Sequence, residues 1–275
     1  MQEKNEQKPS FWAKIALSPF VQGPVLGASV MTLVTPLLKW TNHVYKGERM
    51  SFANPMSGAV AYATSAVPGY ATTFVFKSLL QKPQEETNKQ YDLFTSFVAG
   101  GASGVVCTPF EALAQNKQLT DNPSSKQTAK KMFHHNGYKA FFQGGASIAM
   151  REGLWSMVYL SAIPLMEEVL LERGMAKEQA KLYSVVSVAG AYGFFSAPLN
   201  QLRFRKQQGL TEVLNQKSYL EHAKDIFNQD PKASSFQRMG SFFKASVPRA
   251  ITTTVAGGLV VEGKKLYEET VNTFS

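Results

Sequence analysis

The sequence predicts an all-α membrane protein with six transmembrane helices in three pseudo-repeats. Two observations lead to this fold class: long stretches without charge, and a proline with polar residues after it that recurs three times. We take the 275 residues as one domain, 1–275, with repeats of approximately 15–88, 89–175 and 176–275.

Uncharged stretches supply the expected membrane spans, although the mean hydropathy of the whole chain is only −0.17. A helix needs about 20 apolar residues to cross roughly 30 Å of hydrocarbon. Two further stretches are shorter and carry a charge at or near their starts, which is tolerated where that charge faces an aqueous interior. The four long stretches are 15–38, 50–76, 93–110 and 182–202, and the two short ones are 153–166 and 250–261. The helices that we expect cover 18–45, 58–81, 91–118, 146–173, 179–209 and 245–270.

A proline lies near the end of three of these stretches, at Pro36, Pro109 and Pro198. Pro109 is followed by FEALAQNKQ and Pro198 by LNQLRFRKQ, whereas the run after Pro36, LLKWTNHVY, is a weaker copy. Proline inside a helix removes a backbone hydrogen bond and kinks the helix. Repeated units of this kind are typical of membrane transporters.

Polar segments separate the third helix from the fourth and the fifth from the sixth. Each should hold a short amphipathic surface helix, because Met132–Phe133 and Ile226–Phe227 lie among lysines. Small residues at helix-packing spacing occur at Gly23/Gly27, Gly100/Gly104 and Gly190/Gly193.

Charge and cysteine content narrow the class of protein. Twenty-nine Lys and Arg against 20 Asp and Glu give a net charge of +9, which suits contact with anionic lipids such as cardiolipin. No aromatic–basic module or zinc spacing suggests nucleic acid as a partner. The single cysteine, Cys107, excludes an intramolecular disulfide. His134 and His135 lack further candidate ligands, and no nucleophile–base pair is evident, so we expect no metal, no cofactor and no enzyme.

At the proline motifs the chain resembles the mitochondrial carrier family. That family places an acid two residues, a base five residues and a glutamine nine residues after the proline of each odd-numbered helix. The third helix here keeps Glu111 and Gln118 but has Ala114 in the position of the base. The fifth keeps Arg203 and Gln207 but has Asn200 in the position of the acid.

Other segments extend the resemblance over nearly the whole chain. The family's aromatic-x-Gly element appears as Phe142-Gln143-Gly144, and residues 68–77 resemble the same stretch of ADP/ATP carriers. The resemblance implies three two-helix repeats around a central cavity, in a monomeric, multi-pass carrier of the inner mitochondrial membrane with both termini in the cytosol. Such carriers move a small-molecule substrate by alternating access to one central site, and their short surface helices lie on the matrix side.

A matrix gate is expected where the polar offsets after each proline share one helix face. That face should line the bundle interior, because a charge that points into lipid is costly. In the family, the acid of one odd helix pairs with the base of the next, which leaves one ionic pair here, Glu111 with Arg203. Gln118 and Gln207 would brace it.

The other two gate pairs are not ionic, because they consist of Leu38 with Ala114 and of Asn200 with Thr41. A partly buried ion pair contributes about 1–3 kcal/mol net. A gate with one such pair should open more easily and permit net one-way transport. The alternative is that Glu111 and Arg203 face lipid headgroups.

The resemblance also implies substrate contacts on the even-numbered helices. The fourth helix would contribute Arg151, Glu152 and Trp155, the sixth Arg249 and Thr252, and the second Ser65. Paired hydrogen bonds from arginine suit phosphate or carboxylate, and Trp155 could stack on a purine. The alternatives are a structural pair between Arg151 and Glu152, and a packing role for Trp155.

Several functions remain open on the sequence alone. A nucleotide carrier for ATP or ADP is the first, and a carrier of an amino acid or another small anion is the second, because adjacent Arg151 and Glu152 resemble amino-acid carriers. The third is a carrier-fold membrane scaffold that does not transport, and the fourth is a soluble helical interaction protein. The tail KKLYEETVNTFS resembles the acidic C-terminal export signals of Legionella type IV effectors, which would imply a bacterial carrier delivered to host mitochondria.

Overall fold

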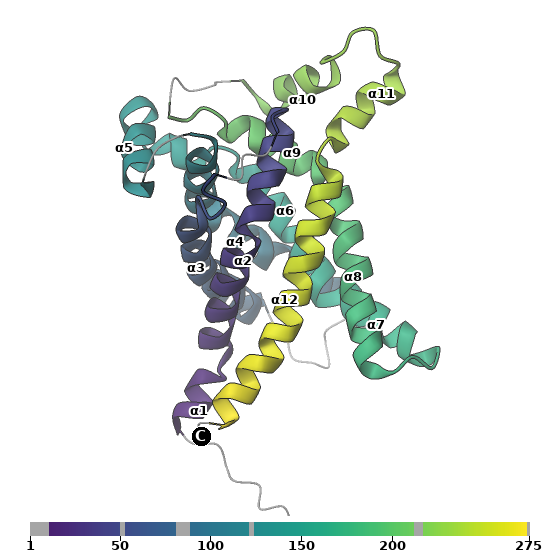
Figure 1. Cartoon of the computed structure of the whole chain (residues 1–275). Coiled ribbons are helices and arrows are strands. Elements are labelled where there is room, and N and C mark those ends of the chain that lie inside the picture. Colours follow the sequence, from purple (N-terminus) through teal and green to yellow (C-terminus); the bar gives the residue numbers. More distant parts are fainter. Residues whose placement is uncertain (1–10, 50–52, 81–88, 121–123, 212–216, 274–275) are drawn as a thin grey trace, which may run out of the picture.

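The computed structural model describes residues 11–49, 53–80, 89–120, 124–211 and 217–273, which are mostly helical and contain no strand (Figure 1). The long helical stretches in this part of the chain are α2 (Pro19–Lys46), α3 (Ala59–Leu80), α4 (Lys89–Leu119), α6 (Gly145–Met157) continued by η3 (Val158–Ala162) and α7 (Ile163–Glu172), α8 (Lys177–Phe195) with α9 (Ala197–Gln207), and α12 (Ser246–Thr273). The short elements are α1 (Phe11–Ala16), α5 (Ser125–Asn136), η2 (Tyr138–Phe142), α10 (Tyr219–Phe227), α11 (Ser235–Gly240) and η4 (Ser241–Phe243).

The expected helix ranges agree with these stretches to within three residues at each described boundary. The expected helix end at residue 81, the repeat boundary at residue 88 and the last two residues of the tail, 274–275, lie outside the described residues.

The long helices pack against one another in chain order. α2 contacts α3, α3 contacts α4, α4 contacts α6, α7 contacts α8 and α8 contacts α12, which returns to α2. The bundle is therefore a closed ring (Figure 1). We call its two ends the α10 end, where α5, α9 and α10 lie, and the α1 end, where α1 meets the last turns of α12.

The outer surface of the bundle is apolar, as a lipid-facing surface must be. Large apolar side chains such as Leu33, Val60 and Phe195 are more than half exposed. Patches of this kind mark a membrane or protein contact in a folded chain. This surface argues against the alternative of a soluble helical interaction protein. The chain has the character of a multi-pass membrane protein.

Fewer spans pass a test of length and hydropathy than the six expected. Within the described residues three helical stretches pass it, Pro19–Lys46, Tyr91–Leu119 and Tyr138–Glu172. A fourth candidate is the bent pair Lys177–Phe195 and Ala197–Gln207, whose axes differ by 51°. α3 and α12 are not among them, so the count of six stays a prediction.

The three motif prolines differ in their local effect. α2 and α4 continue through Pro36 and Pro109 without a break, while the 51° bend separates α8 from α9 just before Pro198. The threonines before the first two prolines bond back to their own helices, Thr35 Oγ1 to the Met31 carbonyl at 2.7 Å and Thr108 Oγ1 to the Gly104 carbonyl at 2.8 Å.

Glycines let the helices approach closely where the sequence predicts small-residue packing. A Cβ on Gly104 of α4 would lie 2.9 Å from Ala149 Cα of α6, and one on Gly193 of α8 would lie 2.7 Å from Ala250 Cα of α12. Real Cβ atoms do not come this close to backbone, so these two positions require glycine.

The fourth long stretch contains a π-helical turn, η3, between α6 and α7. A π turn carries more residues per turn than the α-helix on either side and is frequent near functional sites. It begins three residues after Trp155 and contains Tyr159.

Both expected surface helices form, as α5 and α10, but one apolar residue of each, Met132 and Ile226, points into the protein. Met132 of α5 is fully buried with Ala112, Ala140 and Leu210, and Ile226 of α10 is fully buried as well. Phe133 remains exposed. We therefore correct the expectation for Met132 and Ile226, which anchor the short helices to the bundle and not to lipid.

Candidate site: a buried charge cluster at the α10 end

Three charged side chains meet inside the ring near the α10 end. Glu111 comes from α4, Arg151 from α6 and Arg203 from α9, and their exposures are 6%, 5% and 4%. The helices α4 and α6 expose apolar side chains such as Val105 and Met150, whereas these three charged groups are buried. The alternative that Glu111 and Arg203 face lipid headgroups is wrong.

The carboxylate of Glu111 is shared between the two arginines. Arg203 Nη1 donates to Glu111 Oε2 at 2.9 Å, and Arg151 Nη2 donates to Glu111 Oε1. The contact expected between Glu111 and Arg203 is therefore present. The second arginine was expected to bind substrate, and no feature of the proline repeat indicates that it reaches the gate acid.

Arg151 uses its remaining donors within the same cluster. Its Nε donates to Glu152 Oε1 at 2.8 Å, and its Nη1 donates to Asn200 Oδ1 at 3.1 Å. Asn200 was expected opposite Thr41, whose hydroxyl instead donates to the Leu37 carbonyl at 2.9 Å. One guanidinium thus joins α4, α6 and α9.

Arg249 of α12 is a further cation next to this cluster. Its Nε is buried and has no hydrogen-bond partner in the described part of the chain, and the charges of Arg151 and Arg203 act on it. The described interior therefore holds three arginines against Glu111 and the partly exposed Glu152. A positive surplus in a setting of low dielectric attracts an anion.

Aromatic side chains adjoin Arg151. The Trp155 ring lies 5.0 Å from the Tyr192 ring and 5.8 Å from the Tyr159 ring, measured between centroids. The Tyr192 hydroxyl donates to the Arg151 carbonyl at 2.7 Å. Trp155 packs within this group while remaining half-buried, so both its packing and its stacking role stay open.

The two hydroxyls expected to contact substrate are bonded within their own helices. Thr252 Oγ1 donates to the Pro248 carbonyl at 2.7 Å, and Ser65 Oγ donates to the Tyr62 carbonyl at 2.6 Å. Both side chains are buried. Their substrate contacts stay predictions.

Neutral hydrogen bonds join the remaining helices at the α10 end. Asn42 Nδ2 of α2 donates to Gln118 Oε1 of α4 at 2.7 Å, and Gln118 Nε2 donates to the Ser57 carbonyl at 3.0 Å. Gln207 Nε2 of α9 donates to the Gln143 carbonyl at 2.9 Å. Gln118 and Gln207 therefore brace this end, although in the described part of the chain neither is hydrogen-bonded to Glu111 or Arg203.

Further contacts of this kind involve residues that sequence reasoning missed. Tyr45 OH of α2 donates to the Ala197 carbonyl at 3.1 Å, and its ring lies 5.6 Å from that of Phe204. Asn116 Nδ2 of α4 donates to the Gln207 carbonyl at 2.8 Å. Asn42, Tyr45 and Asn116 lie in the polar runs after the prolines, and that polarity is the signal that could have identified them.

Among the described residues, α2 makes no ion pair across the ring and contributes to its closure in other ways. Leu38 and Ala114, expected opposite each other, belong to one apolar cluster with Val34 and Tyr62. The buried Lys39 points elsewhere, since its ammonium group donates to the Ala53 carbonyl in the connection between α2 and α3. In the described residues, the α10 end of the ring is thus closed by the Glu111–Arg151–Arg203 cluster, by neutral hydrogen bonds and by apolar packing.

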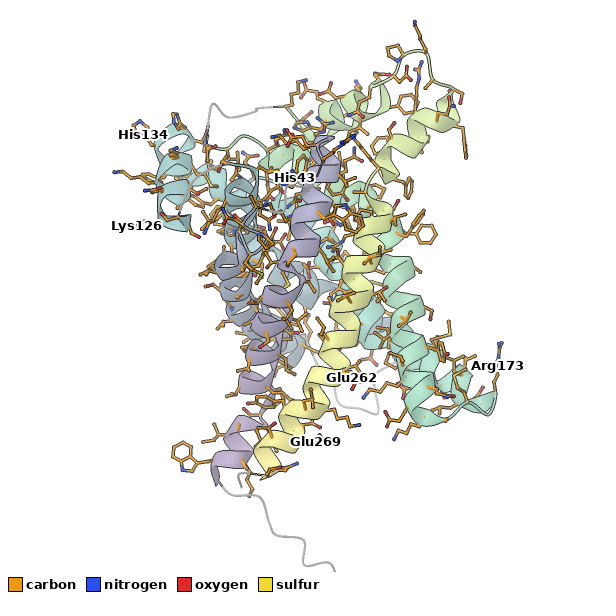
Figure 2. All side chains as sticks on the ribbon, in the orientation of Figure 1. His43, Lys126, His134, Arg173, Glu262 and Glu269 are labelled. Atoms are coloured by element: carbon orange, nitrogen blue, oxygen red, sulfur yellow. The ribbon has the colours of Figure 1, made fainter. Side chains whose placement is uncertain are left out.

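A surface hollow of about 490 Å³ lies on α5, away from this cluster, and is lined by Gln127, Lys130, Lys131 and His134. Figure 2 shows Lys126 and His134 projecting outward from α5 at the α10 end. No group of three metal-binding side chains occurs within the described residues.

Comparison with known proteins gives one family. The family model described as mitochondrial carrier protein matches residues 85–174, a segment that contains α4 to α7 with Glu111 and Arg151. The match falls on the expected second repeat, 89–175. A comparison with curated proteins gives no match. From this match we conclude that residues 85–174, which contribute Glu111 and Arg151 to the charge cluster, form a segment of the mitochondrial carrier family.

Proposed function

We propose that this solute carrier moves an anionic metabolite across the inner mitochondrial membrane by alternating access, with ATP and ADP as the first substrates to test. The observation that carries the proposal is the positive surplus inside the ring, above all the buried and unpartnered Nε of Arg249 beside Arg151 and Arg203. Arginine binds phosphate and carboxylate through parallel hydrogen bonds.

The aromatic group next to Arg151 favours nucleotides among anions. Trp155, Tyr159 and Tyr192 form a cluster that adjoins the arginines, and a purine ring stacks well on such side chains. In this arrangement the phosphates would take Arg249 and Arg151, and the base would lie toward Trp155.

An amino acid is the second candidate substrate. Glu152 is directly bonded to Arg151 and keeps 27% of its side chain exposed. An adjacent acid and base can hold the ammonium and carboxylate groups of one small molecule. This pair is the observation that keeps the amino-acid alternative.

Uptake into liposomes tests these proposals together. The purified chain is reconstituted, and saturable uptake of labelled ATP, ADP, amino acids and dicarboxylates is measured against protein-free liposomes. We expect Arg249→Gln to reduce uptake of the preferred anion at least tenfold, whereas the exposed Lys264→Gln should not. Trp155→Leu should impair nucleotide uptake and leave amino-acid uptake largely intact.

Two results would redirect the proposal. Amino-acid uptake without nucleotide uptake would favour the second candidate. Absence of saturable uptake for every compound would favour a carrier-fold scaffold that does not transport.

The hypothesis that a bacterium delivers this protein to host cells rests on the C-terminal segment alone. α12 runs to Thr273, and the hydroxyls of Thr270 and Thr273 bond back to the Leu266 and Glu269 carbonyls at 2.7 and 2.8 Å. A reporter enzyme fused ahead of residues 256–275 should be translocated by a type IV secretion system, and a Glu268→Lys/Glu269→Lys variant should not. Equal translocation of the two forms would remove this part of the proposal.

A further inference from the structure

Arg151 is the residue on which the closure of the α10 end converges. Its three guanidinium nitrogens all donate: Nη2 to Glu111, Nη1 to Asn200 at 3.1 Å, and Nε to Glu152 at 2.8 Å. Glu111 lies on α4 and Asn200 on α9, while Arg151 itself lies on α6. The guanidinium therefore links three helices. The residues that make these contacts are buried: Glu111 is 6% exposed, Arg151 5% and Asn200 1%.

The same side chain is the best placed to meet an anion. Arg249 leaves the interior with a positive surplus and an unpartnered Nε, and its charge acts directly on Arg151. An anion drawn toward Arg249 thus arrives beside a guanidinium whose three nitrogens each already donate. A two-point contact between the anion and Arg151 then displaces at least one of the oxygens that Arg151 now contacts.

We propose that Arg151 couples substrate binding to opening of the α10 end, because the substrate anion and the Glu111 carboxylate compete for the same guanidinium. When the anion takes Arg151, the links from α6 to Glu111 and to Asn200 are lost together. The α4–α9 contact then depends on Arg203 and on the neutral hydrogen bonds. This inference rests on the proposed transport of an anion and assigns Arg151 a role beyond contact with the substrate.

The competition makes an unusual prediction for Glu111. Removing the acid should tighten binding of the anion, since Arg151 then keeps only Glu152 and Asn200 as partners, and should also weaken closure of the α10 end. We expect Glu111→Gln to lower the dissociation constant of ADP about tenfold, the scale of one hydrogen bond between charged groups. The same variant should release labelled ADP from loaded liposomes several-fold faster than the wild type when no substrate is outside.

Variants at Arg151 separate coupling from simple contact. Arg151→Gln should weaken ADP binding at least tenfold and also increase the release without external substrate, whereas a residue that only contacts substrate would weaken binding alone. Arg151→Lys should recover part of the binding, because charge is retained, but not the closure, because one ammonium cannot reproduce the planar three-way contact. Asp225→Asn at an exposed position serves as the matched control for Glu111→Gln.

The outcomes distinguish failure of this inference from failure of the proposed function. If the wild type transports but Glu111→Gln leaves ADP affinity unchanged, or Arg151→Gln leaves the release rate unchanged, the coupling role is refuted. If the wild type takes up another compound of the panel, the same measurements are made with that compound. If it takes up none, transport itself is refuted. Should Arg151→Gln fail to fold, as judged by gel filtration, the ADP affinity of the Glu111→Gln variant, which retains Arg151, tests the coupling role.

Discussion

Glu111 carries more of the closure than a single ion pair would. Its two carboxylate oxygens accept from arginines on different helices, and each of the three side chains is at least nine-tenths buried. A buried pair contributes little compared with an apolar replacement, but removal of one partner leaves an uncompensated charge that costs about 3–5 kcal/mol. Separation of a single member from the cluster is therefore costly. A ligand that supplies a negative charge to the arginines in place of Glu111 opens the cluster at lower cost.

Asn200 offers a direct test of charge at this cluster. Asn200→Asp places a carboxylate where Arg151 Nη1 now donates at 3.1 Å but gives up the weaker 3.3 Å bond from Asn200 Nδ2 to the Ser196 carbonyl, so closure should gain about 1 kcal/mol. We expect a higher thermal unfolding midpoint and slower uptake.

The matched control is Asn116→Asp. Asn116 Nδ2 donates to the Ala112 and Gln207 carbonyls, so a carboxylate there would repel both oxygens and lower the midpoint. Equal shifts in the two variants would contradict the proposed electrostatics of Asn200.

Tyr45 tests the neutral part of the closure. Tyr45→Phe removes the hydrogen bond to the Ala197 carbonyl but keeps the ring against Phe204, so stability should fall by about 1 kcal/mol. Thermal unfolding measures this change. Tyr183→Phe, at a position that is 56% exposed, should leave the midpoint unaltered; a comparable loss there would argue against the Tyr45 contact.

At the scale of elements, the close approach of α4 to α6 depends more on Gly104 than on Gly101. A Cβ on Gly104 would lie 2.9 Å from Ala149 Cα, whereas one on Gly101 would lie 3.5 Å from the nearest atom, the Ala149 carbonyl oxygen. Gly104→Ala should lower the thermal midpoint by several degrees through a forced shift of backbone, and Gly101→Ala should not. The order of the two midpoints is the check.

The docking of α10 should depend on pH through His222. Burial lowers the pKa of His222 from its usual value of 6.5, assisted by the positive charges of Lys206, Lys217 and Arg205 and opposed by Asp225. The undocked helix takes up a proton near pH 6.5 while the docked helix does not, so docking is complete above that pH and weakens as the pH falls below it.

Hydrogen exchange of α10 at pH 7.5 and pH 5.5 measures this effect. Protection should fall at the lower pH, and His222→Gln should remove most of the difference once intrinsic exchange rates are corrected. Unchanged protection in the wild type would contradict the assignment.

At the scale of the whole molecule, the two ends of the described chain lie together. Tyr267 OH donates to the Ala16 carbonyl at 3.0 Å, and Gln22 Nε2 donates to Glu268 Oε1 at 3.1 Å. Glu269 lies at the α1 end, and Glu262 lies on the same helix at a greater distance from that end (Figure 2). Epitope tags at both termini should therefore be digested from the same side of the membrane in oriented vesicles. Protection of one tag and not the other would rule out this arrangement.

The sequence anticipated the architecture more fully than the site. Helix ranges followed from uncharged length and from polar segments, which are local properties, whereas the contact between Glu111 and Arg203 followed from the pairing rule of the family that the chain resembles. The second contact of Glu111 could not be anticipated, because Arg151 lies 40 residues away on a helix with no motif in common. Tyr45 likewise depends on a backbone carbonyl of α8–α9 whose position is set by the 51° bend.

The π turn at Val158–Ala162 has a consequence for evolution of the fourth long helix. A turn of this type accommodates one residue more than an α-helical turn. Deletion of a single residue here would convert the π turn into an α turn and need not rotate α7 away from its contact with α8.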